Sequence, residues 1–282
     1  MKIAISCETT VDLPEEILTK FDIKTVPFSI LLGEEMILDG QDVSQKIFDY
    51  VAKTKVLPKT SAVNEVQYEE HFLKLLKDYD AVVHISLSSK ISSACDNAKK
   101  VAEKLGLDKV VVVDSLSLST GIALLAIEAR KCIDKGMNLS EVYKYVSSRV
   151  KDVQASFVLL TLNYLYKGGR CSSIAYFGAN LLKIKPEILM IDGEMKPVKK
   201  IIGIMKNVTQ TYFNDLMTRF PNPELENVFI THTGLPKEDA DFLRGKLKER
   251  GFKNIYETRA GGTISSHCGP GCFGILFLNN AQ

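Results

Sequence analysis

Two continuous apolar runs constrain the fold of this chain most strongly, AVVHISLS at 81–88 and KVVVVDS at 109–115. Each run is followed by a segment with apolar residues at helical spacing, over 92–106 and 118–136. An uninterrupted apolar run is typical of a strand buried on both faces, and strands that alternate with helices form parallel sheets covered by helices. The first half of the chain is therefore predicted to be a Rossmann-like α/β domain with a parallel sheet.

The segments around these runs complete the predicted N-terminal domain. KIAIS at 2–6 predicts a strand, and Pro14 followed by two glutamates predicts the first turn of a helix. Residues 23–40 predict extended chain with a turn, which is typical of a hairpin or a long arm. Apolar residues at helical spacing predict three further helices, over 42–53, 64–79 and 138–153.

The second half of the chain follows a different pattern. A strand is predicted over 155–162, followed by a short helix, a glycine turn and another helix over 163–182. A D-G turn joins two apolar runs over 185–201, which predicts a β-hairpin. The remaining predictions are a long amphipathic helix near 205–220, a strand at 227–233, a helix at 237–251 and two final extended segments. This pattern favours a C-terminal α/β domain with a mixed or antiparallel sheet.

Two domains of this kind fit a chain of 282 residues. The change of pattern places the boundary near residue 153, so the predicted domains are 1–153 and 154–282. The 36 basic and 34 acidic side chains leave a formal net charge of +2. This charge is too balanced to indicate nucleic-acid binding.

The sequence contains no targeting segment that we recognise. No stretch approaches the ~20 apolar residues of a membrane span, so we expect no transmembrane segment. The first residues run quickly into acidic side chains, unlike a signal peptide. These features favour a cytoplasmic protein, and in a reducing compartment the six cysteines are expected to be free thiols.

Paired hydroxyls stand before two predicted helices, Thr60 and Ser61 in KTSAVNE and Ser92 and Ser93 in SSKISSACDNA. For any one of them, capping a helix is the commoner role, because serine and threonine accept a hydrogen bond from a free backbone N–H. Ser92 has a further feature, since it follows a strand and opens a helix, where parallel sheets bind ligands and anions are favoured. No GxxxxGK[ST] or GxGxxG motif is present. The pattern therefore suits a small anion such as a carboxylate.

Two glycine-containing stretches carry the other candidate residues. In YKGGRCS, Gly169 and Arg170 fit a surface turn as well as a functional site, and glycines there allow close approach of the backbone. In TISSHCGPGCFGI, His267 stands among small residues. A hydrolase site would need a nucleophile motif such as GxSxG and a partner aspartate, and neither is indicated. A zinc site would need three or four ligands, but His267, Cys268 and Cys272 supply three at most.

Nine stretches resemble, in the same order, motifs of the DegV family of bacterial fatty acid-binding proteins. They are SCETTVDLP, ILDGQDVS, KTSAVNEVQY, SSKISSACDNA, VVDSLSLSTG, LNYLYKGGRCS, KIKPEILMIDGEM, THTGLPKEDA and ISSHCGPGCFGI. LNYLYKGGRCS is the most specific single match. The sequence departs from the family where Glu8 replaces an aspartate and where Ser93 and Ser265 replace glycines.

The resemblance implies two α/β domains with one long-chain fatty acid bound between them. The N-terminal domain would provide headgroup hydroxyls, and the C-terminal domain would provide the acyl-chain pocket. Characterised members deliver the acid to a separate fatty acid kinase, which phosphorylates its carboxyl group to an acyl phosphate. The fatty acid-binding residues implied in this sequence are Thr60, Ser61, Ser92, Ser93, Gly169, Arg170 and His267.

The resemblance thus predicts a non-catalytic lipid carrier without cofactor or metal, in a fatty acid kinase system that serves phospholipid synthesis. Its partners would be a long-chain fatty acid and the kinase, with transient contact with a membrane surface left open. Two alternatives stand beside the carrier: an enzyme that uses His267 as acid–base, and a lipid sensor. In the carrier, we expect His267 to exchange a proton near neutral pH and Arg170 to steady a carboxylate or a developing phosphate.

Overall fold

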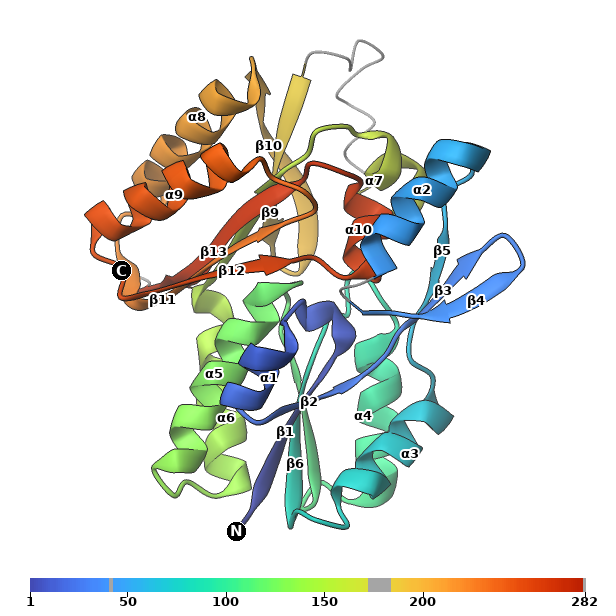
Figure 1. The fold of residues 1–282 in the computed structure, drawn as a ribbon. Coiled ribbons are helices and arrows are strands. Elements are labelled where there is room, and N and C mark those ends of the chain that lie inside the picture. Colours follow the sequence, from blue (N-terminus) through green and yellow to red (C-terminus); the bar gives the residue numbers. More distant parts are fainter. Residues whose placement is uncertain (41–42, 172–183, 281–282) are drawn as a thin grey trace.

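The computed structural model describes residues 1–40, 43–171 and 184–280 (Figure 1). A four-stranded parallel sheet, sheet A, forms the N-terminal part of the fold, with strand order β2-β1-β6-β7. Every residue of β1 and β6 is buried, so the parallel sheet predicted from the apolar runs is confirmed. The strands of sheet A are β1 (Ile3–Glu8), β2 (Ile23–Val26), β6 (Ala81–Ser86) and β7 (Val110–Asp114).

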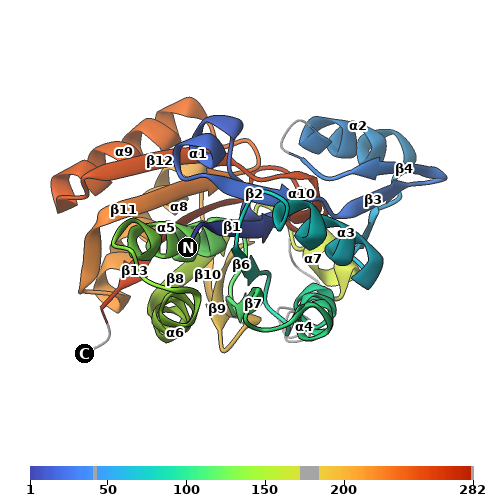
Figure 2. The same cartoon turned by 90° about the horizontal axis from the view of Figure 1, so that it is seen from below.

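Helices cover both faces of sheet A (Figures 1 and 2). On one face α3 (Glu65–Leu75) packs against α4 (Ala94–Leu105), and on the other α5 (Thr120–Asp134) packs against α6 (Leu139–Arg149). A short α1 (Glu15–Lys20) lies against β2. These helices lie where helical spacing predicts them, and α3 and α6 each begin at an asparagine capping box.

The predicted hairpin forms part of a separate small sheet, sheet B, with strand order β4-β3-β5. β3 (Ser29–Leu32) and β4 (Glu35–Leu38) make the hairpin, and β5 (Lys59–Ser61) pairs antiparallel with β3. α2 (Ser44–Thr54) lies between β4 and β5 in the chain. The first part of the predicted extended segment, β2, belongs instead to sheet A. Thr60 therefore stands on a strand rather than at the end of a helix.

The C-terminal part contains a six-stranded sheet, sheet C, with strand order β10-β9-β8-β13-β11-β12. All neighbouring pairs are antiparallel except β11 and β12, so the predicted mixed sheet is confirmed. The predicted D-G hairpin joins β9 and β10, and Asp192 and Gly193 both have positive φ, as its tight turn requires. The strands are β8 (Val153–Val158), β9 (Ile184–Ile191), β10 (Glu194–Ile202), β11 (Pro223–His232), β12 (Asn254–Arg259) and β13 (Phe273–Asn279).

The buried helix α5 connects the two parts of the fold. It packs against β1 and β6 of sheet A and against β8, β11 and β13 of sheet C, so most of its residues are buried. One hydrophobic cluster accordingly includes Ile5 of sheet A and Phe229 of sheet C. The outer face of sheet C is covered by α8 (Met205–Arg219) and α9 (Lys237–Arg250) (Figure 1).

Two short helices lie beside α2, on the side of the molecule away from α8 and α9 (Figure 1). α7 (Asn163–Gly168) is the first helix predicted over 163–182. The second predicted helix falls on residues 172–182, which lie outside the described residues. α10 (Gly262–Cys268) carries His267 and is not predicted by the sequence, because its glycines and serines are weak helix formers.

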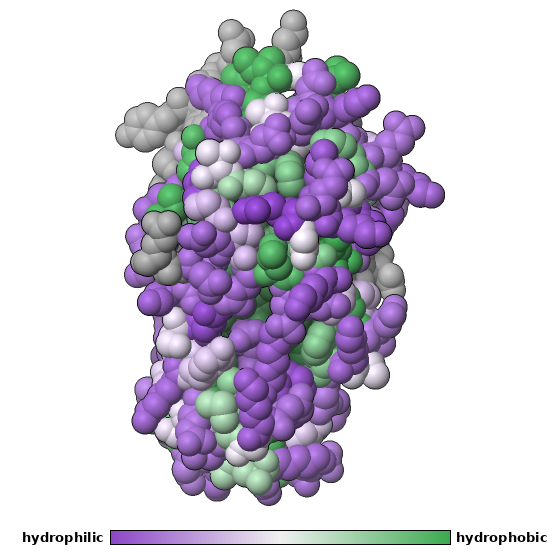
Figure 3. Space-filling model, turned by 90° about the vertical axis from the view of Figure 1, so that its left-hand side faces the viewer, coloured by the Kyte–Doolittle hydropathy of each residue, from purple (hydrophilic) through white to green (hydrophobic). Residues whose placement is uncertain are grey.

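Polar side chains cover most of the face seen in Figure 3, and the cysteines lie in the interior. The described helices include none that is long and apolar enough to cross a membrane. The face in Figure 3 is mostly hydrophilic, and its hydrophobic side chains form small groups between polar ones. All six cysteines are buried and none forms a disulfide bond, as expected for thiols.

Candidate functional site

A cavity of about 260 Å³ opens beyond the carboxyl end of β6, between sheet A and α10. In a parallel sheet, this is the edge at which ligands bind. Its apolar lining residues are Phe28, Ala62, Leu87, Ile91, Leu118, Met195, Ile264 and Cys268. Its polar lining residues are Thr60, Ser92, Ser93, Arg170, Thr263 and His267. The structure thus brings five of the seven predicted site residues to one cavity, and the described lining includes no carboxylate side chain.

Thr60 and His267 meet in the wall of this cavity. Thr60 Oγ1 lies 2.9 Å from His267 Nε2, within hydrogen-bond distance. The N-cap of α3 is Asn64, whose side chain accepts a hydrogen bond from Gln67 N at 3.0 Å. The hydroxyl of Thr60 is therefore not a helix cap, and it is available to the cavity. Ser61 is exposed on β5 and does not belong to the lining.

Ser92 and Ser93 occupy the turn between β6 and α4. Ser92 Oγ accepts a hydrogen bond from Ala94 N at 3.2 Å, so it serves the start of the helix as well as the cavity. Ser93 is the N-cap residue, but its side chain makes no capping hydrogen bond and the residue is exposed. The N-terminus of α4 thus brings backbone donors and the positive end of a helix dipole close to the cavity.

Burial makes His267 a neutral side chain. Desolvation, followed by the positive charge of Arg170, lowers the pKa of His267 from 6.5 to about 4. The expectation that it exchanges a proton near neutral pH is therefore wrong. Its Nδ1 is buried and has no hydrogen-bond partner within the described parts of the chain. The ring packs closely on α7, where a Cβ added to Gly168 would lie 2.6 Å from Nδ1.

Arg170 and Gly169 lie at the mouth of the cavity, after the end of α7. Arg170 is exposed and donates a hydrogen bond from Nη1 to the backbone oxygen of Gly168 at 2.7 Å. It also lines a neighbouring cavity of about 320 Å³, together with Gly169, Lys90 and Lys196. Gly169 lines only this second cavity, and its φ of 68° lets it end the helix in the left-handed region.

Two buried carboxylates hold the N-terminus of α10, the helix that carries His267. Asp12 Oδ1 accepts a hydrogen bond from Gly261 N at 2.6 Å, and Asp39 Oδ1 accepts one from Thr263 N at 3.0 Å. Burial raises the pKa of both carboxyl groups. These positioning residues are not predicted, because their partners lie 249 and 224 residues away. The sequence gives one indication of their importance. Asp12 lies in TTVDLP and Asp39 in ILDGQD, and both stretches resemble motifs of the family described above.

A second buried polar group, the Glu8 cluster, lies next to the cavity. It consists of Glu8 with Tyr68, His84 and Ser86. Glu8 Oε1 accepts hydrogen bonds from Tyr68 OH at 2.5 Å and Ser86 Oγ at 2.6 Å, and lies 3.0 Å from His84 Nε2. Oε2 accepts a hydrogen bond at 2.9 Å from the backbone N–H of Leu87, a cavity residue. Burial raises the pKa of Glu8, but the charge of His84 and these hydrogen bonds outweigh it and lower the pKa from 4.5 to about 2.

The geometry gives no support to the hydrolase alternative. Ser265 Oγ donates to Ser44 Oγ at 3.0 Å, and Ser266 Oγ donates to the backbone oxygen of Gly262 at 2.7 Å. Among the described residues, the side chain that hydrogen-bonds to His267 is Thr60, so neither serine is activated as a nucleophile would be. Residues 1–40, 43–171 and 184–280 contain no group of three or more His, Cys, Asp or Glu side chains placed to hold a metal ion.

Comparisons with known proteins agree on one family. The family model described as "Uncharacterised protein, DegV family" matches residues 2–280. The chain is 28% identical over 290 residues to a fatty acid-binding protein from Thermotoga maritima, with 100% of each chain covered. It resembles the crystal structure of a DegV lipid binding protein from Thermotoga maritima, at a TM-score of 0.89 and 27% identity, with 100% of each chain covered. It also resembles DegV, a fatty acid binding protein from Bacillus subtilis, at a TM-score of 0.85 and 25% identity, covering 99% of this chain and 100% of that one.

Proposed function

Since the chain belongs to the DegV family, we propose that it binds one long-chain fatty acid and presents the carboxyl group to a partner kinase. The carboxyl group lies at Thr60, Ser92 and His267 in this proposal. The observation that carries it is the Thr60–His267 hydrogen bond in the wall of a cavity whose other residues are mainly apolar. Solved relatives described as lipid binding or fatty acid binding support the class of ligand.

The headgroup end suits a carboxyl group held by neutral hydrogen bonds. The hydroxyls of Thr60 and Ser92 can donate and accept, so they serve a protonated acid as well as a carboxylate. His267 is neutral at pH 7 because its pKa is about 4. Arg170 is therefore the one cation among the described lining residues, and it stands at the solvent side. This arrangement favours a buried acid whose charge develops toward the mouth of the cavity.

The acyl tail extends from the hydroxyls into the interior between sheets A and C. Leu118, Ile264 and Cys268 line both the headgroup cavity and a small void of about 20 Å³. That void reaches Phe157 and Leu276 of sheet C, so it marks the direction of the tail. It is too small for an acyl chain, so side chains along it separate on binding. Each buried CH₂ contributes ~0.8 kcal/mol, so the tail supplies most of the affinity.

The proposal assigns different parts of the ligand to the two predicted domains. Residues 1–153 supply the headgroup hydroxyls, and residues 154–282 supply the acyl-chain pocket and the two glycine-containing loops. The proposed rim of the headgroup site consists of Ser61, Ser93 and Gly169. Arg170 can steady a carboxylate or an arriving phosphoryl group with paired donors. The protein itself is a cytoplasmic carrier in this proposal, and the kinase performs the phosphorylation that feeds phospholipid synthesis.

The binding half of the proposal is tested by native mass spectrometry of purified protein loaded with a defined fatty acid. We expect one fatty acid per chain in the wild type, and about fivefold weaker retention in Thr60→Ala and in Ser92→Ala, because each loses one net hydrogen bond. Asn64→Ala is the matched control, since it removes the true cap of α3 and should lower the melting temperature without changing retention. Wild-type protein that neither carries nor takes up fatty acid would refute the proposal.

The presentation half is tested by loading Arg170→Ala and His267→Ala with the same fatty acid and comparing acyl phosphate formation by a fatty acid kinase at matched occupancy. We expect both variants to keep most of their lipid, because the tail dominates affinity, and to be phosphorylated more slowly than the wild type. Equal rates for all three proteins would remove Arg170 and His267 from the transfer step. Complete loss of lipid from His267→Ala would mean that the headgroup contacts, rather than the tail, supply most of the affinity.

A further inference from the structure

The stretch THTGLPKEDA resembles a family motif, but the proposed function assigns no role to it. It includes the end of β11 and the turn that leads to α9. His232 shapes this turn, because its Nδ1 accepts hydrogen bonds from the backbone N–H groups of Gly234 and Leu235 at 3.2 and 3.3 Å. Gly234 has a φ of 116°, a conformation that favours glycine. Thr233, which lies between these residues, therefore has a fixed backbone position.

Thr233 holds the turn that follows α10, from Gly269 to Cys272. Its hydroxyl donates a hydrogen bond to Gly269 O at 2.7 Å and accepts one from Cys272 N at 2.9 Å. Its backbone N–H donates to Cys272 O at 2.8 Å, and its backbone oxygen accepts a hydrogen bond from Gly271 N at 3.4 Å. Thr233 thus bridges both ends of a turn that begins two residues after His267.

The same turn contacts α7, the helix on which His267 packs. A Cβ added to Gly269 would lie 2.6 Å from Tyr164 Cδ2, so the backbone of the turn lies close to α7. The ring of His267 lies close to Gly168, at the end of the same helix. A displacement of the turn would therefore change the contact between His267 and α7.

The helix α10 depends on contacts at both of its ends. It has seven residues, and its glycine, serines and β-branched residues are weak helix formers, so its own propensity does not fix its position. Asp12 and Asp39 hold its N-terminus, as described above. Thr233 has the corresponding role at its C-terminal end.

We infer that Thr233 is a positioning residue, which keeps His267 buried and within hydrogen-bond distance of Thr60 by holding the end of α10. Without the hydroxyl, Gly269 O and Cys272 N would each lose a hydrogen bond, and the turn would rearrange to satisfy them. The inference deepens the proposed function. Its effect on fatty acid binding rests on that function, whereas the position of His267 does not.

A direct contact between Thr233 and the acyl tail has to be separated from this positioning role. Thr233 lines the void of about 20 Å³ on the proposed path of the tail. Thr233→Val separates the two roles, because valine has a similar shape without the hydroxyl. A residue that only lined the tail would bind it as well or better when it became more apolar. Positioning predicts the opposite sign, with fatty acid affinity about fivefold weaker, as for one lost hydrogen bond.

NMR titration of the histidine ring signals measures the position of His267 without any ligand. The chain has four histidines, and His267→Gln identifies the signal of His267. Its pKa in the wild type is about 4, because burial and the charge of Arg170 disfavour the charged ring. We expect Thr233→Val to raise this pKa toward 6.5 as the ring gains contact with water. Thr233→Ser keeps the hydroxyl and should keep the wild-type pKa of His267.

Thr209→Val is the matched control, since Thr209 is also a buried threonine with a hydrogen-bonded hydroxyl. Its Oγ1 donates to Met205 O, Lys206 O and Asp239 Oδ1, at 3.1, 2.9 and 3.2 Å. These partners belong to α8 and α9, on the outer face of sheet C. We expect this variant to lower the melting temperature but to change neither the pKa of His267 nor fatty acid affinity.

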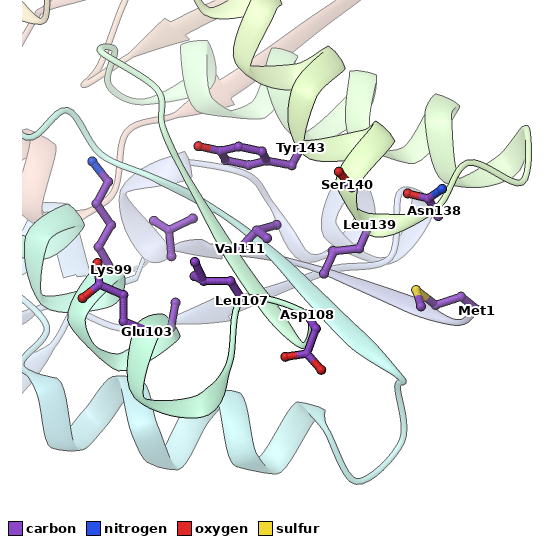
Figure 4. Close-up of a pocket in the computed structure, with 12 residues that line it drawn as sticks. Met1, Lys99, Glu103, Leu107, Asp108, Val111, Asn138, Leu139, Ser140 and Tyr143 are labelled. Atoms are coloured by element: carbon purple, nitrogen blue, oxygen red, sulfur yellow. The ribbon is translucent and has the colours of Figure 1, made fainter.

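A groove between α4 and α6 allows the inference and the proposed function to fail separately (Figure 4). Its volume is about 560 Å³, and its lining includes Val111, Leu139 and Tyr143. A fatty acid bound in this groove would lose affinity in Tyr143→Ala and not in Thr233→Val. A raised pKa of His267 with unchanged affinity in Thr233→Val would thus support the positioning role and refute the proposed headgroup site.

Gly271→Ala disturbs the same turn without removing the hydroxyl of Thr233. Gly271 has a φ of 73°, which alanine adopts only with strain, and its added Cβ would lie 2.8 Å from Leu160 Cδ2. This variant should therefore also raise the pKa of His267, and it decides the question if circular dichroism shows that Thr233→Val does not fold. A pKa that stays at about 4 in folded Thr233→Val, or in Gly271→Ala where Thr233→Val does not fold, would overturn the inference.

Discussion

The Glu8 cluster and the Thr60–His267 site are both buried polar groups at the same end of sheet A, but they differ in how completely they are hydrogen-bonded. The two carboxylate oxygens of Glu8 receive hydrogen bonds from side chains and from the backbone of Leu87. At the site, Nδ1 of His267 has no partner among the described residues. A satisfied polar network stabilises one conformation, whereas an incomplete one beside a cavity has capacity for a ligand.

The same contrast explains why burial has different results for the two side chains. Glu8 is buried next to His84, so the charged carboxylate is favoured and its pKa falls to about 2. His267 is buried next to the cation Arg170, so the charged imidazolium is disfavoured and its pKa falls to about 4. One cluster therefore keeps a charge that the fold needs, and the other keeps a neutral ring beside a cavity. The comparison predicts that substitutions in the Glu8 cluster mainly lower the free energy of unfolding, whereas substitutions at the Thr60–His267 site mainly lower fatty acid affinity.

The largest effect is expected from Glu8→Ala. This substitution leaves the buried His84, Tyr68 and Ser86 without their shared partner, which should cost about 3–5 kcal/mol in the free energy of unfolding. Urea denaturation followed by circular dichroism measures it. Glu8→Asp is the control and should lose less, because it keeps the carboxylate. If Glu8→Ala were as stable as the wild type but retained less lipid, the Glu8 cluster would serve binding rather than stability.

Acid should act on both regions, and the sign follows from the direction of each pKa shift. The pKa values of His71 and His267 fall from 6.5 to about 4, so the unfolded chain takes up protons first and stability is lost as pH falls from about 6.5 to 4. Glu8, with its pKa lowered from 4.5 to about 2, adds a further loss below about pH 4.5. The raised pKa values of Asp12 and Asp39 act in the opposite direction.

Single variants separate these contributions in denaturation curves recorded between pH 7 and 4. His71 joins the Glu8 cluster through Ser6, whose Oγ lies 2.8 Å from His71 Nε2 and 2.9 Å from His84 Nδ1. We expect His71→Gln to flatten the loss of stability with or without added fatty acid. His267→Gln should flatten it chiefly in lipid-free protein. A pH profile that neither substitution changes would contradict the assignment.

The smallest effect on stability, with a clear effect on binding, is expected from Gly168→Ala. A Cβ there would lie 2.6 Å from Nδ1 of His267, so the ring must move away from Thr60. We expect fatty acid affinity to fall about fivefold, as for one lost hydrogen bond, with little change in the melting temperature. Gly245→Ala on α9 is the control, because its Cβ would meet no atom within 4 Å. Equal affinity in both variants would mean that the position of His267 is irrelevant to the ligand.

The sequence predicts the features that depend on neighbouring residues. The four valines of β7 predict a strand buried between helices, because a strand without polar alternation needs cover on both faces. The Asp192–Gly193 turn predicts the β9–β10 hairpin, because both positions require positive φ. The stretches that resemble DegV motifs also predict most of the residues that line the cavity. The spacing of residues along the chain does not by itself predict that Thr60 lies next to His267.

Features that depend on distant contacts are not predicted. Thr60 precedes a helix in the sequence, but β5 pairs with β3 and leaves the capping position to Asn64. The glycines and serines of α10 are weak helix formers, and the helix is held by Asp12 and Asp39 from the other end of the chain. The pKa of His267 depends on burial and on Arg170, which no pattern around the histidine reveals.

The position of β13 in sheet C has a consequence for synthesis of the protein. This strand, the last element of the chain, lies between β8 and β11 rather than at an edge. Thr60 and His267 are 207 residues apart, so a ribosome adding about 5–20 residues per second makes the histidine about 10–40 s after the threonine. During that interval sheet A can form, but sheet C lacks its central strand β13. The headgroup site then contains Thr60 but not yet His267. A nascent chain therefore leaves part of the apolar surface of α5 exposed until β13 has emerged, because β13 is one of the strands of sheet C that pack against this helix.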